Sequence, residues 1–135
     1  MKFLVIALAL FVAVSAVTEE QKEKVKKYGL ECLEESHADK EQVKKLKSGE
    51  TSEEVDHNVK CFVKCFFRRT GFFNEQDEFQ EQVTVDKLSL DTTADTRESV
   101  QEAVTKCKGE TDADPCVKAY KIFKCYQDLK HVSLV

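Results

Sequence analysis

The sequence predicts an all-α domain, and three observations support that prediction. Only one proline and four glycines occur among the 135 residues. Lys, Glu and Gln are abundant, and apolar residues recur at the three- and four-residue spacing of helix faces. Six cysteines are distributed among these stretches, which is typical of a small domain held together by disulfides. We therefore expect six helices stapled by disulfides.

The first sixteen residues have the features of a secretory signal peptide. Lys2 gives a positive start, residues 3–14 form an unbroken apolar run, and residues 14–16 supply a cleavage site. The run is too short for a membrane-spanning helix, so we expect no membrane insertion. We expect residues 17–135 to form one domain that is secreted and extracellular, because their number is typical of a single domain.

Charge and motifs exclude several classes of function. The formal net charge is −4 and would become −5 once Lys2 is removed with the signal peptide. Acidic chains are poor candidates for binding nucleic acids or anionic membranes. Residues 17–135 contain no nucleophile elbow and no cluster with metal-ligand spacing. We therefore expect no enzyme activity, no cofactor and no metal site.

Capping residues and apolar spacing predict the first two helices. The first is expected from Thr18, with Gln21 completing a capping box, to about Ser36. Its inward face is expected to contain Val25, Tyr28, Cys32 and Leu33. A second, short helix should begin at Asp39 and end before Ser48. Its expected buried pair is Val43 and Leu46.

The third helix should be the longest and most apolar. It is expected from Thr51, with Glu54 in the capping-box position, to Thr70, and Gly71 is a suitable residue to end it. Four polar residues spaced by four should face solvent: Asp56, Lys60, Lys64 and Arg68. Four apolar residues lie roughly opposite them: Val55, Val59, Phe62 and Phe66.

Three further helices are expected, over about 75–88, 94–108 and 115–129. In the first of these, Phe79 and Val83 should face inward, although residues 83–85 are also good strand sequence. The next should bury Val100, Ala103, Val104 and Cys107. The last has a strong start signal, because a capping Asp114 precedes Pro115. Its apolar residues are Val117, Ala119, Tyr120, Ile122, Phe123 and Tyr126.

Helix geometry limits how the cysteines can pair. Six cysteines allow fifteen pairings. Cys116 and Cys125 lie in one helix about 13.5 Å apart, at 1.5 Å per residue, which exceeds the roughly 7 Å reach of a disulfide. A bridge along one helix between Cys61 and Cys65 is poorly directed. Excluding both leaves ten pairings, and the spacing alone does not choose among them.

The cysteine spacing resembles that of the insect odorant-binding proteins, the pheromone/general odorant-binding family. The gaps between the cysteines are 28, 3, 41, 8 and 8 residues, and the three-residue and last eight-residue gaps are the family's most constant. The segment 60–67 also resembles dipteran members that bind fatty acids. The resemblance implies six helices around an internal apolar cavity, with disulfides Cys32–Cys65, Cys61–Cys116 and Cys107–Cys125.

The same resemblance implies a function and a ligand site. It implies a secreted carrier that reversibly binds small hydrophobic ligands, such as odorants, pheromones or long-chain fatty acids, with a chemosensory receptor as a candidate partner. Apolar pockets usually contain few polar groups. The expected lining of the cavity is Val55, Phe62, Phe66, Arg69, Phe72, Phe73, Phe79, Val83, Val104, Ala119 and Phe123. The alternative is a secreted structural or interaction protein with the same fold and a filled core.

Three polar features have competing interpretations. Arg69 lies on the apolar side of its helix and could bind a fatty-acid carboxylate, or could only stabilise the helix end and reach solvent. His57, Cys61 and Cys65 have a spacing of four, but oxidised cysteines would not bind a metal. The third feature is a possible pH switch for ligand release at His37, His57 or His131, where His131 adjoins an apolar tail that could cover the cavity.

Overall fold

The fold is all-α, as the sequence predicts. The computed structural model describes residues 20, 22–49, 55–91 and 97–130. The first helix has its described residues at 20 and 22–36. Five labelled helices follow it: α2 (Lys40–Lys47), α3 (His57–Thr70), α4 (Glu81–Asp91), α5 (Arg97–Cys107) and α6 (Pro115–Lys130). In these ranges the only extended pairing is a single antiparallel bridge between Phe73 and Phe79.

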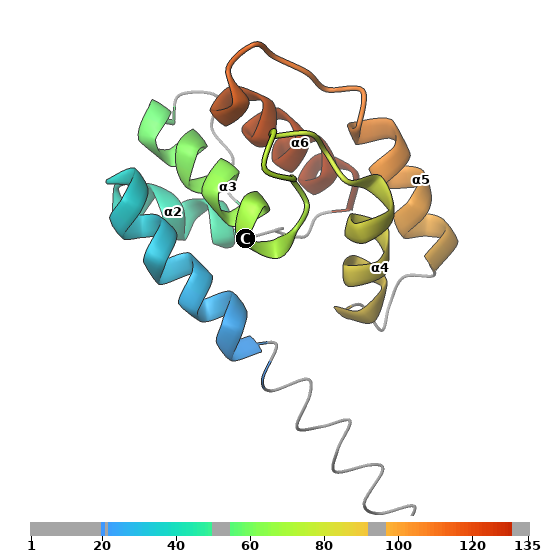
Figure 1. Ribbon diagram of the computed structural model, residues 1–135, viewed down its shortest axis with the longest axis horizontal. Helices are drawn as coiled ribbons and strands as arrows, with labels where there is room; N and C mark the ends of the chain where they lie inside the picture. The colour runs from blue at the N-terminus through green and yellow to red at the C-terminus, as the bar shows by residue number, and fades with distance from the viewer. Residues whose placement is uncertain (1–19, 21, 50–54, 92–96, 131–135) are drawn as a thin grey trace, which may run out of the picture.

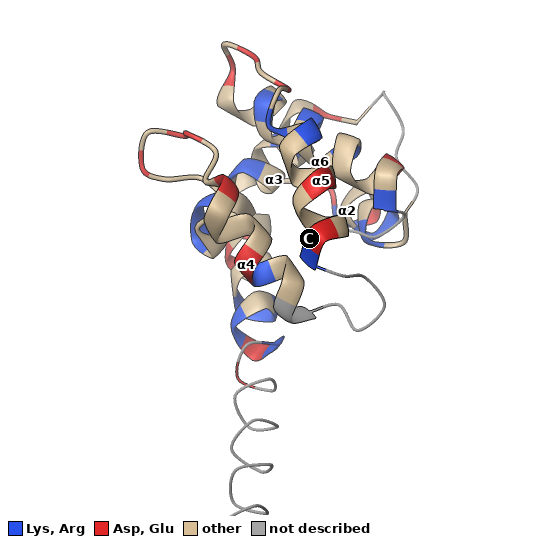
Figure 2. Ribbon diagram, turned by 90° about the vertical axis from the view of Figure 1, so that its right-hand side faces the viewer, with Lys and Arg blue, Asp and Glu red and all other residues tan. Residues whose placement is uncertain are grey.

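The centre of the molecule is the packing of α3 against α6 (Figure 1). The first helix and α2 lie on one side of this pair, whereas α4 and α5 lie on the other (Figure 1). Helix α5 packs on both α4 and α6. Acidic and basic residues are interspersed along the helices (Figure 2). No described helix is both long enough and apolar enough to cross a membrane.

The α3–α6 pair supplies half of one continuous apolar core. Helix α3 contributes Val59, Phe62, Val63, Phe66 and Phe67, all at most 3% exposed. Helix α6 contributes Ala119, Tyr120, Ile122, Phe123 and Tyr126. Both sets follow the helical period, so the spacing of apolar residues places them on one face. The inward faces expected for α2, α5 and α6 are confirmed, except that Val117 is only half-buried.

Several helix ends follow their capping signals. Asp39 precedes α2, and its side chain accepts a hydrogen bond from the backbone N–H of Glu41 at 3.0 Å. Gly71 ends α3 in the left-handed conformation, with φ 87°, which glycine adopts without steric cost. Pro115 is the first residue of α6.

Helix α3 begins later than expected. Its first residue is His57 rather than Thr51; residues 50–54 lie outside the described ranges, and Val55 and Asp56 are not helical. The Gln42 side chain explains this boundary, because it binds Asp56 twice. The Gln42 amide donates to Asp56 Oδ2 at 3.0 Å, and Gln42 Oε1 accepts from the Asp56 N–H at 3.0 Å. These bonds hold Asp56 in an extended conformation.

The fourth helix also begins later, and its buried face differs. It starts at Glu81 rather than near residue 75. Asn74 Oδ1 accepts from the N–H groups of Gln76 and Glu78, both at 2.9 Å, and such local bonds compete with helix formation. Val83 was expected to face inward but is 38% exposed, whereas Val85 is fully buried.

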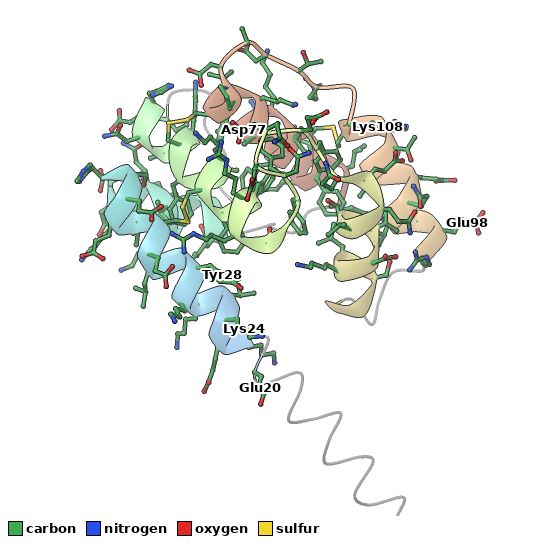
Figure 3. All side chains as sticks on the ribbon, viewed as in Figure 1. Glu20, Lys24, Tyr28, Asp77, Glu98 and Lys108 are labelled. Carbon is green, nitrogen blue, oxygen red and sulfur yellow. A yellow bond between two sulfur atoms is a disulfide. The ribbon has the colours of Figure 1, made fainter. Side chains whose placement is uncertain are left out.

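The first helix buries only its later turns. Cys32 is fully buried and both Tyr28 and Leu33 pack against the core, as expected. Val25 was expected to face inward and is 43% exposed. Figure 3 explains the difference, because the end of the helix with Glu20 and Lys24 points away from the rest of the molecule. The expected signal peptide, residues 1–16, lies outside the described residues and stays a prediction.

Candidate functional site

Three disulfides frame the aromatic core. They join Cys32 to Cys65, Cys61 to Cys116 and Cys107 to Cys125. The Cα–Cα distances are 5.6, 4.4 and 5.6 Å, within the range that disulfides require. This is the pairing that the family resemblance implies. Helix α3 is therefore bonded through Cys65 to the first helix and through Cys61 to α6 (Figure 3).

Five of the six expected cavity phenylalanines lie in two groups of ring contacts, and Phe67 belongs to the second group. Phe62 stacks on Phe66 with ring centroids 6.4 Å apart. Phe67 contacts the ring edges of Phe72 at 5.5 Å and Phe73 at 5.3 Å. A further ring contact joins Phe73 to the half-buried Phe79, with ring centroids 6.4 Å apart. A chain of aromatic rings thus leads from the core to the surface.

The remaining apolar residues of the expected lining fall into two classes. Val104, Ala119 and Phe123 are at most 1% exposed and belong to the same core cluster. Val55 packs against that cluster and is partly buried. Val83 is not part of the cluster, and its side chain is 38% exposed. That the buried members line a ligand cavity stays a prediction.

Arg69 is bound by two carboxylates from the first helix. Its guanidinium donates to Glu31 and, at 2.6 Å, to Glu35. One third of the arginine side chain is exposed. Arg69 thus joins the end of α3 to the first helix, next to the Cys32–Cys65 disulfide. A ligand carboxylate at Arg69 would have to compete with both glutamates.

The region around His57 is a hydrogen-bonded helix junction. His57 Nε2 lies 2.7 Å from Asp114 Oδ2, and Asp114 Oδ1 accepts from the backbone N–H of Cys116 at 2.9 Å. The hydrogen bond with His57, followed by that from Cys116, lowers the pKa of the Asp114 carboxyl. His57 also lies near Cys61 and Cys116, but the two sulfurs are bonded to each other and are not metal ligands.

The other two histidines give no further support to a pH switch. His37 is exposed and has a positive φ of 56° at the end of the first helix. His131 and the tail that follows it lie outside the described residues. A role for any of these histidines in ligand release stays a prediction.

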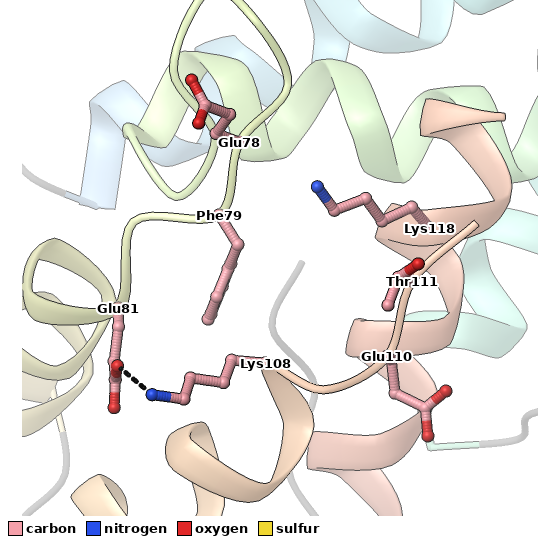
Figure 4. Close-up of a pocket in the computed structure, with 7 residues that line it drawn as sticks. All are labelled: Glu78, Phe79, Glu81, Lys108, Glu110, Thr111 and Lys118. Atoms are coloured by element: carbon pink, nitrogen blue, oxygen red, sulfur yellow. Dashed lines mark hydrogen bonds and ion pairs between the residues drawn. The ribbon is translucent and has the colours of Figure 1, made fainter. Parts of the chain in front are cut away.

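A surface pocket of about 340 Å³ lies beside the outer end of the aromatic chain. Its lining is Glu78, Phe79, Glu81, Lys108, Glu110, Thr111 and Lys118 (Figure 4). We call it the Phe79 pocket. It shares only Phe79 with the lining expected from the sequence. Its walls come from the segment before α4, the start of α4, the segment between α5 and α6, and α6 itself.

The charged residues of the Phe79 pocket differ in the partners that they bind. Glu81 is bound by Lys108 at 2.9 Å and by the Thr105 hydroxyl at 2.8 Å, and these two hydrogen bonds lower the pKa of its carboxyl. Lys118 instead donates to the backbone carbonyl of Asp77 at 2.9 Å. Sequence reasoning missed Lys118, because a lysine beside the apolar face of a helix is usually solvent-exposed.

Comparison with known proteins identifies the family. Residues 14–128 match the sequence profile of the PBP/GOBP family, which covers most of the chain. The chain belongs to the PBP/GOBP family. General odorant-binding protein 56a of Drosophila melanogaster is 30% identical over 134 residues, covering 95% of this chain and 93% of that protein. Odorant-binding protein 10 of Aedes aegypti is 30% identical over 106 residues, covering 78% and 73% respectively.

Two solved structures share the fold of this chain. OBP56a, a fatty acid binding protein from the oral disk of the blowfly Phormia regina, is 34% identical with a TM-score of 0.67, covering 84% of this chain and 94% of that chain. Odorant Binding Protein 7 of Anopheles gambiae, which has four disulfide bridges and was solved with an azo compound, is 23% identical with a TM-score of 0.65, covering 83% and 87%. None of these names describes an enzyme.

Proposed function

We propose that the protein is a secreted carrier that binds and solubilises small hydrophobic molecules reversibly. Its ligands would be odorants, pheromones or fatty acids, and we favour long-chain fatty acids. The observation that best supports this choice is the likeness to the blowfly fatty acid binding protein, at 34% identity over nearly the whole of that chain. The aromatic core between α3 and α6 would be the binding region.

The chemistry of this region suits an apolar ligand. A buried hydrocarbon chain gains roughly 25 cal/mol for each Å² of apolar area removed from water. The rings of Phe62, Phe66 and Phe123 supply large apolar surfaces without hydrogen-bonding groups. Because these rings are at most 3% exposed, a ligand would enter by displacing ring–ring contacts, and the exchange would be non-covalent.

The disulfides would keep the helices in place during that exchange. Core side chains are closely packed, so inserting a ligand into them ordinarily forces the backbone to shift. Two of the cross-links fix α3 to the first helix and to α6, at cysteines that directly precede Phe62 and Phe66. The rings could therefore change rotamer while the helices stay together. The arrangement of the helices would thus be the same before and after the ligand is released.

Displacement of a fluorescent probe tests the proposal. The chain contains no tryptophan, so an extrinsic probe such as N-phenyl-1-naphthylamine is needed. We expect the probe to bind at micromolar concentration and to be displaced by hexadecanoic acid and hexadecan-1-ol. The reduced and alkylated chain is the control for nonspecific binding. If the native protein does not bind the probe, or if neither compound displaces it, the protein is not a carrier of such ligands.

A pair of variants locates the site. Phe66→Leu replaces one ring of the α3 stack with a smaller aliphatic side chain. We expect about fourfold weaker binding of hexadecanoic acid, because the ligand loses apolar contact equivalent to about one methylene. Leu30→Ala is the matched control, because Leu30 is 66% exposed on the first helix. Equal affinity of the two variants would place the ligand outside the aromatic core and would favour a filled core with a structural or interaction role.

A further inference from the structure

The Phe79 pocket lies directly beside the chain of aromatic rings. Phe79 is half-buried and lines the pocket, and its ring centroid is 6.4 Å from that of Phe73. Phe73 in turn contacts Phe67 on α3 at 5.3 Å. Figure 4 shows the Phe79 side chain among the residues that line the pocket, and the same ring contacts Phe73 of the core. An extended ligand could pass Phe79 and reach the core.

Lys118 is the distinctive cation of this pocket. Its ammonium lies 5.3 Å above the centroid of the Phe73 ring and donates one hydrogen bond, to the Asp77 carbonyl. Among the described residues, the ion pairs include Lys108 with Glu81 and Arg69 with two glutamates, but none includes Lys118. An ammonium has three N–H donors. Two donors of Lys118 are thus available to an anion.

The acidic residues of the pocket limit where an anion can bind. Glu81 is already neutralised by Lys108, and Glu78 accepts a hydrogen bond from Asn74 at 3.2 Å. Figure 4 shows Glu110 pointing away from Phe79, whereas Lys118 extends toward the segment that contains Phe79. A bound carboxylate would therefore lie on the Lys118 side of the pocket, next to the Phe73 ring. A half-buried site of this kind strengthens a charge-assisted hydrogen bond.

We propose that the Phe79 pocket is the entrance for an acyl ligand with an anionic head group. The Lys118 ammonium binds the carboxylate, and the acyl chain passes Phe79 toward Phe73 and Phe67. This inference rests on the proposed carrier function and specifies it. It assigns head-group selectivity to Lys118 rather than to Arg69, whose carboxylate partners are internal. The protein should accordingly prefer a fatty acid to the alcohol of the same chain length.

Binding of a matched acid and alcohol tests the role of Lys118. Displacement of N-phenyl-1-naphthylamine is measured at pH 8 with hexadecanoic acid and hexadecan-1-ol, for the native chain and for Lys118→Gln. We expect the dissociation constant of the acid to rise about tenfold in K118Q, as for the loss of one charged hydrogen bond, and that of the alcohol to change less than twofold. Lys118→Arg should keep the preference for the acid.

Lys121→Gln is the matched control on the same helix. Lys121 pairs with Asp112 at 3.1 Å and does not line the Phe79 pocket, so K121Q should bind both ligands as the native chain does. An equal loss of acid binding in K118Q and K121Q would overturn the inference in favour of a nonspecific charge effect. Unchanged acid binding in K118Q would also overturn it, while alcohol binding would leave the carrier function standing. If the native chain binds neither ligand, the carrier function itself fails.

A second measurement keeps the test valid if K118Q loosens the segment around Asp77. Phe79→Trp gives the chain its only indole, at the proposed entrance. We expect 2-bromohexadecanoic acid to quench that indole, because the bromine lies beside the carboxylate. Leu129→Trp is the control, since Leu129 is 43% exposed and lies outside the pocket, and we expect no quenching there. Binding of the acid without quenching in F79W would exclude this entrance.

Discussion

The α3–α6 interface and the segment 72–80 are held together by different forces. The interface is cross-linked by the Cys61–Cys116 disulfide and filled by apolar side chains. The segment 72–80 packs Phe72 and Phe73 in the core, but its outer part is held by polar contacts: Arg68 binds both carboxylate oxygens of Asp77, at 2.5 and 2.7 Å, and Lys118 binds the Asp77 carbonyl. Yet both regions contribute phenylalanines to one core.

This difference indicates which side of the core can open. Separating α3 from α6 requires exposure of many buried rings and is limited further by the cross-link. Opening residues 74–80 breaks mainly hydrogen bonds that each contribute about 1 kcal/mol and that water can replace. Regions with few apolar contacts open locally at lower free energy than the core. The outer part of the segment, residues 74–80 with the half-buried Phe79, is thus the wall that opens most readily, whereas Phe72 and Phe73 are packed in the core.

The largest effect should follow from removing the cross-link of the interface. The Cys61→Ser and Cys116→Ser double variant opens a loop of 55 residues, and loop-closure entropy predicts a loss of about 4 kcal/mol in the free energy of unfolding. The Cys107→Ser and Cys125→Ser pair, which closes only 18 residues, should lose about 3 kcal/mol. Urea unfolding at 25 °C measures both. A smaller loss for the first pair would contradict the central role of the interface.

A moderate and local effect is expected in the segment 72–80. Asp77→Asn keeps a residue that tolerates the positive φ of 60° but removes the charge that binds Arg68. Because 43% of the Arg68 side chain is exposed, the loss of global stability should be at most about 1 kcal/mol. Hydrogen exchange should accelerate at the Gln80 amide, which donates to the Phe72 carbonyl at 2.7 Å.

The D77N variant distinguishes the segment 72–80 from the α3–α6 interface only if hydrogen exchange accelerates in the segment alone. Amides of α3 and α6 that exchange through global unfolding should accelerate only by the amount that the small loss of global stability predicts. Val83→Ala is a suitable control on α4, because Val83 is exposed and does not bind the segment. Equal acceleration in the segment and in the α3–α6 helices would mean that the two regions open together.

Local signals predicted most of the fold. The end of α3 at Gly71 and the start of α6 at Pro115 depend on residues within one turn of the boundary. The start of α3 depends instead on Gln42, fourteen residues away, which no capping signal reveals. On α4 the apolar residues are spread around the helix, so the period does not select a face, and packing against α5 leaves Val85 inward and Val83 outward.

The candidate site was less predictable than the fold. The phenylalanines of α3 and α6 were found because helical spacing marks the buried face. The partners of Arg69 are more than thirty residues away, so its apolar position suggested a ligand where the structure has two glutamates. Lys118 lines a pocket formed by four segments of the chain, and the spacing of residues within α6 cannot predict such a pocket.

The smallest effect concerns acid pH at the junction of α3 and α6. The Asp114 carboxyl has a folded-state pKa below its ordinary value of 3.8, mainly because of the hydrogen bond with His57. A depressed carboxyl pKa stabilises the fold fully above the ordinary value, and that contribution is lost as the pH falls through the folded-state pKa. The free energy of unfolding should therefore decline below about pH 4, where Glu81, Asp86 and Asp112 contribute in the same direction.

Asp114→Asn isolates the contribution of this junction. Asparagine is as good a helix cap as aspartate, so α6 should keep its start while the titrating group is lost. We expect a shallower decline of stability below about pH 4 in urea titrations of D114N. His57→Gln should flatten the curve in the same direction, because it removes the main cause of the lowered pKa. An unchanged slope in D114N would show that the α3–α6 interface depends on its disulfide and apolar packing alone.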